Sequence, residues 1–285
     1  MKVRLLARDS KMPNVAIMQI AAYHKQQGHN VGWYNPLFDH NDTDILYESQ
    51  LFNFTDPYLY YPENAKIIKG GTGIDITKQL PPEIEDIRDL DYSLYPDCNY
   101  SMQFYSRGCI RNCPFCVVRK KEGFIKSVKP YNLNPNGKHI EILDNNFFAN
   151  PNWREAVQDI LNTGQKINLH GVDVRLIDEE QADALNTLKH TGTIHIAWDF
   201  PKMDLRPQLE NVTKWIKPYK LMCYVLIGYN STPDEDLYRV ETLRELGIAP
   251  FVMPYNKFDK YQKRFARWVN HKAIFKSVKW EDYKV

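Results

Sequence analysis

Between residues 102 and 254 the chain alternates short apolar runs with segments of helical periodicity, and this alternation constrains the fold more than any other feature. Leu221–Ile227 is apolar throughout, as in a strand buried on both faces. Helix signals separate such runs: Asp178 and Gln181 predict a capping box, and Gly164 predicts a helix end. The predicted strands are Met102–Tyr105, His139–Leu143, Lys166–Leu169, Thr193–Trp198, Leu221–Ile227 and Pro250–Met253.

This order predicts an α/β fold in which parallel strands, joined by helical crossovers, curl into a partial (β/α)6 TIM-like barrel. Barrels of this kind carry their chemistry at the carboxyl ends of the strands. The polar residues that follow the predicted strands are therefore candidate site residues. They are Asp144, Asn145 and Asn146, then His170, Asp173 and Arg175, then Asp199, then Asn230 and Ser231, and finally Tyr255.

The first stretch of the chain predicts a small Rossmann-like α/β domain. Val3–Leu6 and Val31–Tyr34 read as strands around a helix from Pro13 to Gln27, which Gly28 ends. Further strands are expected at 45–47 and 65–68, and the polar segment Lys78–Pro96 reads as a linker. The predicted domains are 1–97 for the cap and linker, 98–256 for the barrel and 257–285 for a C-terminal helix.

Three of the five cysteines lie on one short loop, as Cys109, Cys113 and Cys116 in the spacing CxxxCxxC. Three thiolates on one loop can hold three corners of a [4Fe–4S] cube, which leaves one iron open to a small molecule. The alternatives are a zinc site or buried thiols, although zinc usually takes four protein ligands and no second cysteine pair follows. The odd cysteine count and the lack of a signal peptide favour a reducing cytosol over disulfides.

This loop, with Phe115 just before its last cysteine, resembles the signature of the radical S-adenosylmethionine (SAM) superfamily. The resemblance implies that SAM chelates the open iron and is reductively cleaved to a 5′-deoxyadenosyl radical, which abstracts hydrogen from a substrate. It also implies a (β/α)6 barrel, a position for Phe115 near the adenine, and an electron donor such as flavodoxin or ferredoxin. The sequence does not identify the substrate, which could be a metabolite, a peptide or a nucleic acid.

The same resemblance implies cofactor-binding roles for the strand-end residues. Asp144, Asn145 and Asn146 stand where the family has its "GGE" motif, which contacts the SAM amino group. Arg175 is a candidate for the SAM carboxylate, and Gly228 for a close backbone approach to adenine. The full set of SAM-site candidates is Phe115, Asp144, Asn145, Asn146, Asp173, Arg175, Asp199, Gly228, Asn230 and Tyr255.

Each of these assignments has a structural alternative. Asp144 or Asn146 could simply cap the helix that follows. Asp173 and Arg175 could pair with each other, and His170 could be a core histidine. Cys98 and Cys223 are expected to be a bystander and a core residue.

The first domain also resembles the cobalamin-binding domain of class B radical SAM enzymes. The resemblance lies in Pro13, in Gly28–Val31 and in the pair Gly70–Gly71, whereas a DxHxxG motif for the lower cobalt ligand is absent. On spacing alone the glycine run is a structural turn. We expect a reduced cap that does not hold cobalamin, and a cobalamin-dependent methyltransferase that does hold it is the first alternative function.

Charge is nearly balanced over the chain, with a net charge of +2, but residues 254–285 hold nine Lys or Arg against three Asp or Glu. Tyr261, Phe265, Trp268 and Val269 share one face of a predicted amphipathic helix there. That helix either closes the barrel or, with Arg107, Arg111, Arg119, Lys120 and Lys121, forms a basic docking surface. A zinc- or cluster-stabilised nucleic-acid-binding module is therefore the second alternative. No apolar span predicts a membrane segment, so a cytoplasmic location is expected.

Overall fold

The computed structural model describes residues 1–284, which divide into two compact units, the first from Met1 to Ile140 and the second from Glu141 onward. Both units contain parallel strands followed by helices, so the predicted α/β class is confirmed. The predicted domain boundary at residue 97 lies inside the first unit, and the C-terminal helices belong to the second.

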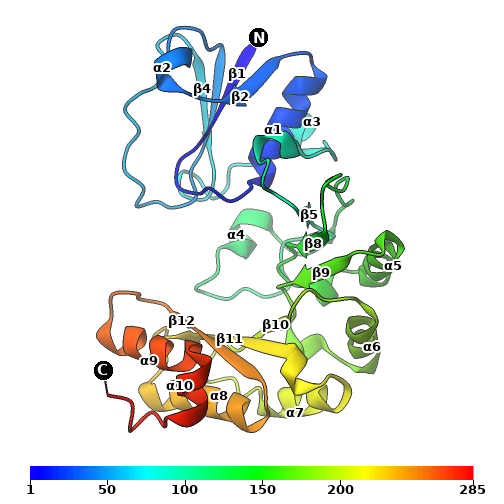
Figure 1. The fold of residues 1–285 in the computed structure, drawn as a ribbon, viewed down its shortest axis with the longest axis vertical. Helices are drawn as coiled ribbons and strands as arrows, with labels where there is room; N and C mark the ends of the chain where they lie inside the picture. The colour runs from blue at the N-terminus through cyan, green and yellow to red at the C-terminus, as the bar shows by residue number, and fades with distance from the viewer. Residues whose placement is uncertain (285) are drawn as a thin grey trace. The chain divides into compact units, whose positions relative to one another are not determined.

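The first unit is built on a four-stranded parallel sheet in the order β2-β1-β3-β4 (Figure 1). Its strands are β1 (Lys2–Ala7), β2 (Asn30–Trp33), β3 (Ile45–Ser49) and β4 (Lys66–Gly70). Helix α1 (Val15–Gln26) connects β1 to β2 and begins where the Asn14 side chain accepts from the Ile17 amide. Val3, Leu5, Ile17 and Ile20 form the core beneath it. The four strands and the helix agree with the sequence prediction.

The segment predicted as a linker is packed rather than free. It contains α3 (Pro82–Glu85) and a 3₁₀ turn at Tyr92–Leu94, and Ile84 and Leu94 are buried in the core of the first unit. Gln19 in α1 donates to the carbonyls of Ile84, Glu85 and Ile87. The apolar residues Ile84 and Leu94 explain why this acidic segment packs on the first unit. They give it apolar side chains to bury, which a solvated linker lacks.

The remaining elements of the first unit are short. Helix α2 (Pro36–Asp39) follows β2, and after the linker segment come β5 (Ser101–Gln103), β6 (Ser106–Arg107), α4 (Val118–Glu122) and β7 (Lys126–Ser127). The predicted strand 102–105 is shorter than expected, because the chain leaves β5 and starts β6, which pairs antiparallel with β7. Strand β8 (His139–Ile142) crosses the boundary between the units.

The second unit alternates strands and helices as predicted. Its strands are β9 (Lys166–Leu169), β10 (Ile194–Ala197), β11 (Leu221–Ile227) and β12 (Ala249–Pro254), and β10-β11-β12 pair in parallel (Figure 1). Its helices are α5 (Trp153–Thr163), α6 (Glu179–Thr187), α7 (Arg206–Trp215), α8 (Pro233–Glu245), α9 (Lys260–Asn270) and α10 (Lys272–Ser277). The predicted capping box of Asp178 and Gln181 is present, and a second joins Thr232 to Glu235.

Burial alternates along β8, β9 and the first part of β11, where every second residue is buried. Ile142, Leu169, Ile196 and Val225 are all but removed from solvent. On the other face of the β10-β11-β12 sheet the register aligns Ala197 with Tyr224 and Tyr224 with Phe251, which is 41% exposed, whereas His195 is 9% exposed. This sheet therefore has one buried face and one face that is exposed only in part.

The predicted single C-terminal helix is wrong, because the structure has two. His271 ends α9 and begins α10 with a non-helical backbone, and its Nδ1 accepts from the Ile274 amide. A capping side chain that satisfies this amide makes the break favourable. The apolar face of α9 is buried, and Asn270 bonds both backbone groups of Val252 in β12, so this helix packs on the sheet. Among residues 1–284 no helix is long and apolar enough to cross a membrane.

Candidate metal centre and strand-end residues

The cysteine loop is closed at its base by a two-stranded ribbon. β6 pairs with β7 through Ser106↔Ser127 and Arg107↔Lys126. Glu122 joins the two sides as well, since its carboxylate accepts from the Gly108 amide at 2.9 Å and from Arg107 at 2.8 Å. The loop that carries the three cysteines therefore has fixed ends.

Gly108 occupies a position that only glycine fits. Its φ is +85°, and a Cβ there would lie 2.5 Å from the carbonyl oxygen of Phe124. This close approach lets the chain turn from β6 directly into Cys109, whose amide donates to the Gly123 carbonyl.

The three loop cysteines form no disulfide within the described chain, and Cys116 is exposed. The amide of Arg111 donates to Cys109 Sγ at 3.4 Å, and the amide of Cys116 donates to the Cys113 carbonyl at 2.9 Å. A backbone amide aimed at sulfur is one means by which proteins stabilise cluster thiolates. Three thiols on one loop, one of which accepts from a backbone amide, are a donor set of the kind that an iron–sulfur cube takes.

Within residues 1–284 no group of three or more His, Cys, Asp or Glu side chains that could hold a metal ion is found.

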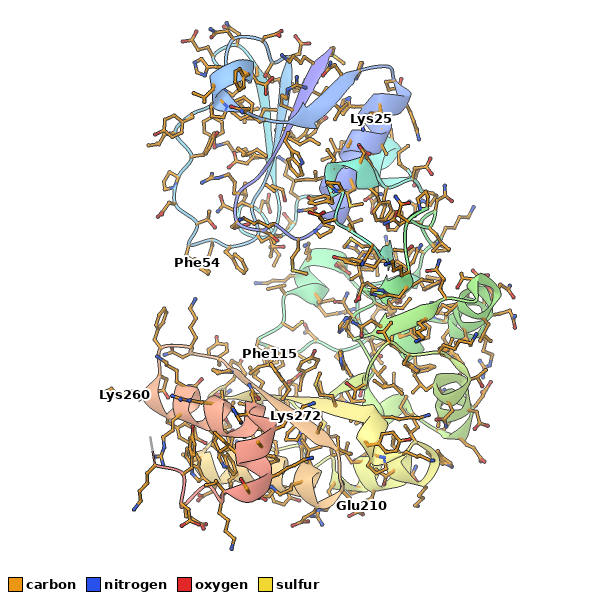
Figure 2. All side chains as sticks on the ribbon, viewed as in Figure 1. Lys25, Phe54, Phe115, Glu210, Lys260 and Lys272 are labelled. Carbon is orange, nitrogen blue, oxygen red and sulfur yellow. The ribbon has the colours of Figure 1, made fainter. Side chains whose placement is uncertain are left out.

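The basic residues beside the loop have partners in the first unit. Arg119 donates to the Cys109 carbonyl at 3.2 Å, and Lys121 donates to Thr72 at 2.8 Å in the glycine-rich turn after β4. Burial lowers the pKa of Lys121. Phe115 lies half-buried on the same loop, where Figure 2 labels it.

In the second unit, the turn that follows β8 packs tightly on the turn that follows β9. A Cβ on Gly171 would lie 2.0 Å from the carbonyl oxygen of Asp144, and the Gly171 carbonyl accepts from the Phe147 amide at 2.8 Å. Asp144 and Asn146 are buried there, and Asn145 is exposed. The side chain of Asn146 caps no helix; its Oδ1 is buried without a hydrogen-bond partner among the described residues.

Asp173 and Arg175 pair with each other, so the structural alternative holds for this couple. Arg175 Nε and Nη2 donate to the two Asp173 oxygens at 2.6 and 2.8 Å. Asn146 Nδ2 also approaches Asp173, at 3.5 Å. The structure thus brings together the residues that follow β8 and β9.

Asp199 follows β10, and its Oδ1 is buried without a hydrogen-bond partner in the described part of the chain. Burial raises the pKa of this carboxyl, and the backbone of Leu226, Arg239 and Arg175 oppose the rise. Burial also raises the pKa of Cys223, which is a core residue of β11 as expected.

The residues after β11 and β12 are more exposed. The space at Gly228 is occupied by the Gln262 side chain, whose Nε2 would lie 2.1 Å from a Cβ there. Asn230 is exposed with a φ of 52°, and the rings of Tyr229 and Tyr255 lie 5.0 Å apart.

The second unit also contains a row of polar residues, Glu141, Asn168, His170 and His195, that contact one another. The sequence analysis named only His170 among them. Glu141, Asn168 and His195 each lie in mid-strand, and Glu141 and His195 each contact His170. The sequence signal is a single polar residue between two apolar ones, as in Ile140-Glu141-Ile142 and Ile194-His195-Ile196.

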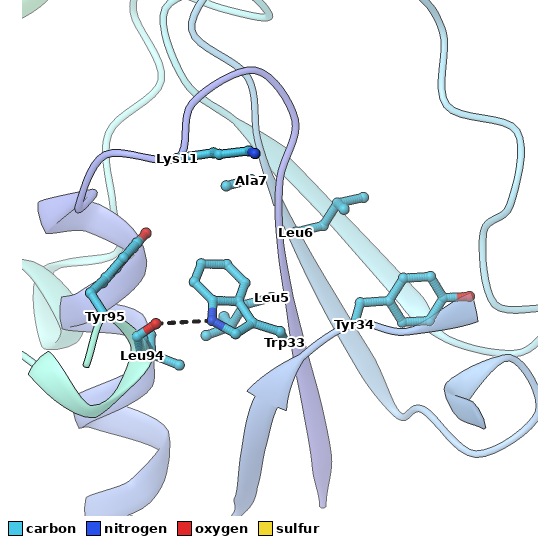
Figure 3. Close-up of a pocket in the computed structure, with 8 residues that line it drawn as sticks. All are labelled: Leu5, Leu6, Ala7, Lys11, Trp33, Tyr34, Leu94 and Tyr95. Atoms are coloured by element: carbon cyan, nitrogen blue, oxygen red, sulfur yellow. Dashed lines mark hydrogen bonds between the residues drawn. The ribbon is translucent and has the colours of Figure 1, made fainter. Parts of the chain in front are cut away.

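The first unit has a pocket of about 370 Å³ at the carboxyl ends of β1 and β2 (Figure 3). Lys11, Trp33, Tyr34 and Tyr95 contribute to its walls, and Trp33 Nε1 donates to the Leu94 carbonyl at 3.1 Å. The described residues that line it include no histidine, so they supply no imidazole for a lower cobalt ligand.

No protein-family model matches this chain, and no curated protein matches it.

Proposed function

We propose that this chain is a radical SAM enzyme in which Cys109, Cys113 and Cys116 hold a [4Fe–4S] cluster. The observation that carries the proposal is the donor set: three thiols in the CxxxCxxC spacing on one loop whose ends are joined by β6 and β7. When bound and reduced, the cluster supplies the electron that cleaves SAM to a 5′-deoxyadenosyl radical.

The residues of the loop would bind and tune such a cluster. The Arg111 amide donates to Cys109 Sγ and would stabilise its thiolate once a cluster is bound, and the guanidinium of Arg119 holds the backbone of the same cysteine. Cationic side chains at 107, 111, 119 and 120 offset the negative charge of thiolates. Phe115 remains our candidate for packing beside the adenine.

Two acceptors in the second unit suit the ammonium group of SAM. Asn146 Oδ1 and Asp199 Oδ1 are buried without protein partners among residues 1–284, and a buried acceptor is costly unless a donor completes it. Asp144 and Asn145 are further candidates. Arg175 is held in place by Asp173, and its Nη1 lies 3.2 Å from Met203 Sδ, a weak acceptor that a carboxylate would replace.

We also propose that the two units are a Rossmann-like cap and a partial (β/α)6 barrel. The alternation in 98–256 and the parallel β10-β11-β12 sheet support a partial (β/α)6 barrel, and the parallel sheet of the first unit supports a Rossmann-like cap. The enzyme would use flavodoxin or ferredoxin as its electron donor in the cytoplasm. Its substrate is a metabolite, a peptide or a nucleic acid.

The test is anaerobic reconstitution with iron and sulfide, reduction in the presence of excess SAM, and mass spectrometry of the products. We expect 5′-deoxyadenosine and methionine from the wild-type protein and neither from Cys113→Ala. Cys98→Ala is the matched control, because Cys98 is buried outside the loop and its Sγ donates to the Tyr100 carbonyl.

Three outcomes would redirect the proposal. Intact SAM from a protein that carries its full iron load contradicts radical chemistry. Retained zinc with salt-sensitive nucleic-acid affinity favours the binding module. S-adenosylhomocysteine together with bound cobalamin favours the methyltransferase.

A further inference from the structure

Glu141, His170 and His195 form a hydrogen-bonded chain across three strands of the second unit. Glu141 Oε2 lies 3.0 Å from His170 Nε2, and His170 Nδ1 lies 2.8 Å from His195 Nδ1. Glu141 belongs to β8, His170 follows β9, and His195 belongs to β10. Neither the cysteine loop nor the SAM-site candidates include Glu141 or His195.

The direction of the hydrogen bonds follows from the carboxylate. An ionised Glu141 can only accept, so His170 Nε2 carries the hydrogen of the first bond. A neutral His170 then has a bare Nδ1, which accepts from His195 Nδ1–H. His195 Nε2 is consequently the bare nitrogen at the end of the chain.

The position of His195 keeps it neutral. Its side chain is 9% exposed, and burial, with the neighbouring His170, lowers its pKa to about 4, while Glu141 opposes that shift. Glu141 from β8, His170 after β9 and Tyr224 from β11 are the titratable groups that face it. Among the described residues, none forms a hydrogen bond with His195 Nε2.

We propose that His195 Nε2 is the proton acceptor of a general-base site on the face of the β10-β11-β12 sheet that carries Tyr224 and Phe251, oriented by Glu141 through His170. The ligand class is a flat molecule with a weakly acidic O–H or N–H group. The ring of Tyr224 lies edge-on to His195 at 5.4 Å, and Phe251 lies edge-on to Tyr224 at 5.7 Å, so the surface beside the base is aromatic.

The proton transfer balances within the chain. The ligand O–H or N–H bond breaks and its electron pair stays on the ligand, while a new Nε2–H bond forms on His195. The Nδ1 proton of His195 passes to His170 Nδ1, and the positive charge comes to rest beside the Glu141 carboxylate. This is the logic by which a carboxylate orients and stabilises a catalytic histidine. The site needs no cluster, so its test is independent of the proposed radical chemistry.

The substitution Glu141→Gln should reverse the chain. Asn168 Nδ2 donates to both Glu141 oxygens, at 3.2 and 3.1 Å. In the variant, Asn168 therefore donates to the single oxygen of the new side-chain amide and turns the amide nitrogen towards His170. His170 Nε2 must then accept, its Nδ1 carries the hydrogen, and His195 becomes the Nε2–H tautomer.

The first measurement is the nitrogen-15 NMR spectrum of histidine-labelled full-length protein at neutral pH. We expect the Nδ1–H tautomer of His195 in the wild type and the Nε2–H tautomer in Glu141→Gln. The pair His24 and His29, with Nδ1 atoms 2.9 Å apart and no carboxylate in its chain, serves as the internal control and as the test of folding. The proposal is overturned if His195 carries its hydrogen on Nε2 in the wild type. It is also overturned if the tautomer of His195 is the same in Glu141→Gln as in the wild type.

The second measurement titrates phenol, which keeps its O–H at neutral pH, into the nitrogen-15-labelled wild-type protein. We expect a saturable shift of the His195 Nε2 resonance, because the phenol O–H donates to that nitrogen before any proton is transferred, and no saturable binding of phenol to His195→Gln. A His195 Nε2 resonance that does not respond to phenol overturns the ligand assignment.

Discussion

Arg239 and Asp236, one turn apart in α8, form an ion pair that is closed to solvent. Arg239 Nη2 donates to Asp236 Oδ1 at 2.6 Å, and the two side chains are 0% and 1% exposed. Arg239 also donates to the Trp198 carbonyl at 2.8 Å, and Tyr261 of α9 donates to the other Asp236 oxygen at 3.1 Å. The pair therefore joins α8 to the end of β10 and to α9.

Removal of the cation should strongly destabilise the second unit. Arg239→Met leaves the Asp236 carboxylate buried without its counter-charge, which we expect to cost about 3–5 kcal/mol in the free energy of unfolding. Chemical denaturation measures the loss. Arg206→Met is the control, since Arg206 pairs with the exposed Glu245 and should change stability by about 1 kcal/mol or less. A loss at Arg239 no larger than the control would show that the pair does not bear on stability.

Acid should weaken the first unit through His24. Burial and the nearby His29 lower the pKa of His24 to about 4 from its usual 6.5, so the folded state favours the neutral ring. Its contribution is complete above pH 6.5 and is lost as the pH falls from there to about 4. Between about pH 7 and about pH 4.5 we expect a loss on the order of 2 kcal/mol.

His24→Gln should remove that part of the pH dependence in denaturation curves recorded across this range. His40→Gln is the control, because the His40 side chain is 40% exposed and only approaches Glu63, at 3.8 Å. Parallel pH profiles for wild type and His24→Gln would contradict the assignment.

The entry to the cysteine loop should not tolerate a side chain. Gly108→Ala places a Cβ against the Phe124 carbonyl and also strains a positive φ. Gly123→Ala strains a similar φ of +78° but meets no atom within 4 Å. We expect Gly108→Ala to be the less stable variant by about 1–3 kcal/mol, measured by denaturation of the metal-free protein. Equal stability of the two variants would mean that the backbone at Phe124 can move away from residue 108 at little cost in free energy.

Glu122 should affect retention of a cluster without being a ligand. Its carboxylate fixes Gly108 and Arg107 at the loop entry, so Glu122→Ala should free the loop and lower iron affinity about tenfold, as outer residues of metal sites do. Competition with an iron chelator after reconstitution measures this. Glu83→Ala, at an exposed site in α3, should behave as wild type. Unchanged retention in Glu122→Ala would count against a positioning role.

Local signals in the sequence predict much of the fold. The bounds of β9 and β11 match the predicted strands, and the capping boxes of Asp178 and Thr232 start α6 and α8. These features depend on hydrogen bonds and burial within a few residues, which a single segment contains. The spacing of the three cysteines is likewise a local property.

Contacts between distant residues were decided by the tertiary structure. The sequence alone predicted the alternation of strands and helices from β8 to β12 and placed three thiols on one loop. Only the fold decided that Glu122 ties that loop to Gly108 and that Glu141 meets His195 through His170. The reason is physical: a hydrogen bond across strands requires a particular register and side-chain direction, and both are set by the packing of the whole sheet.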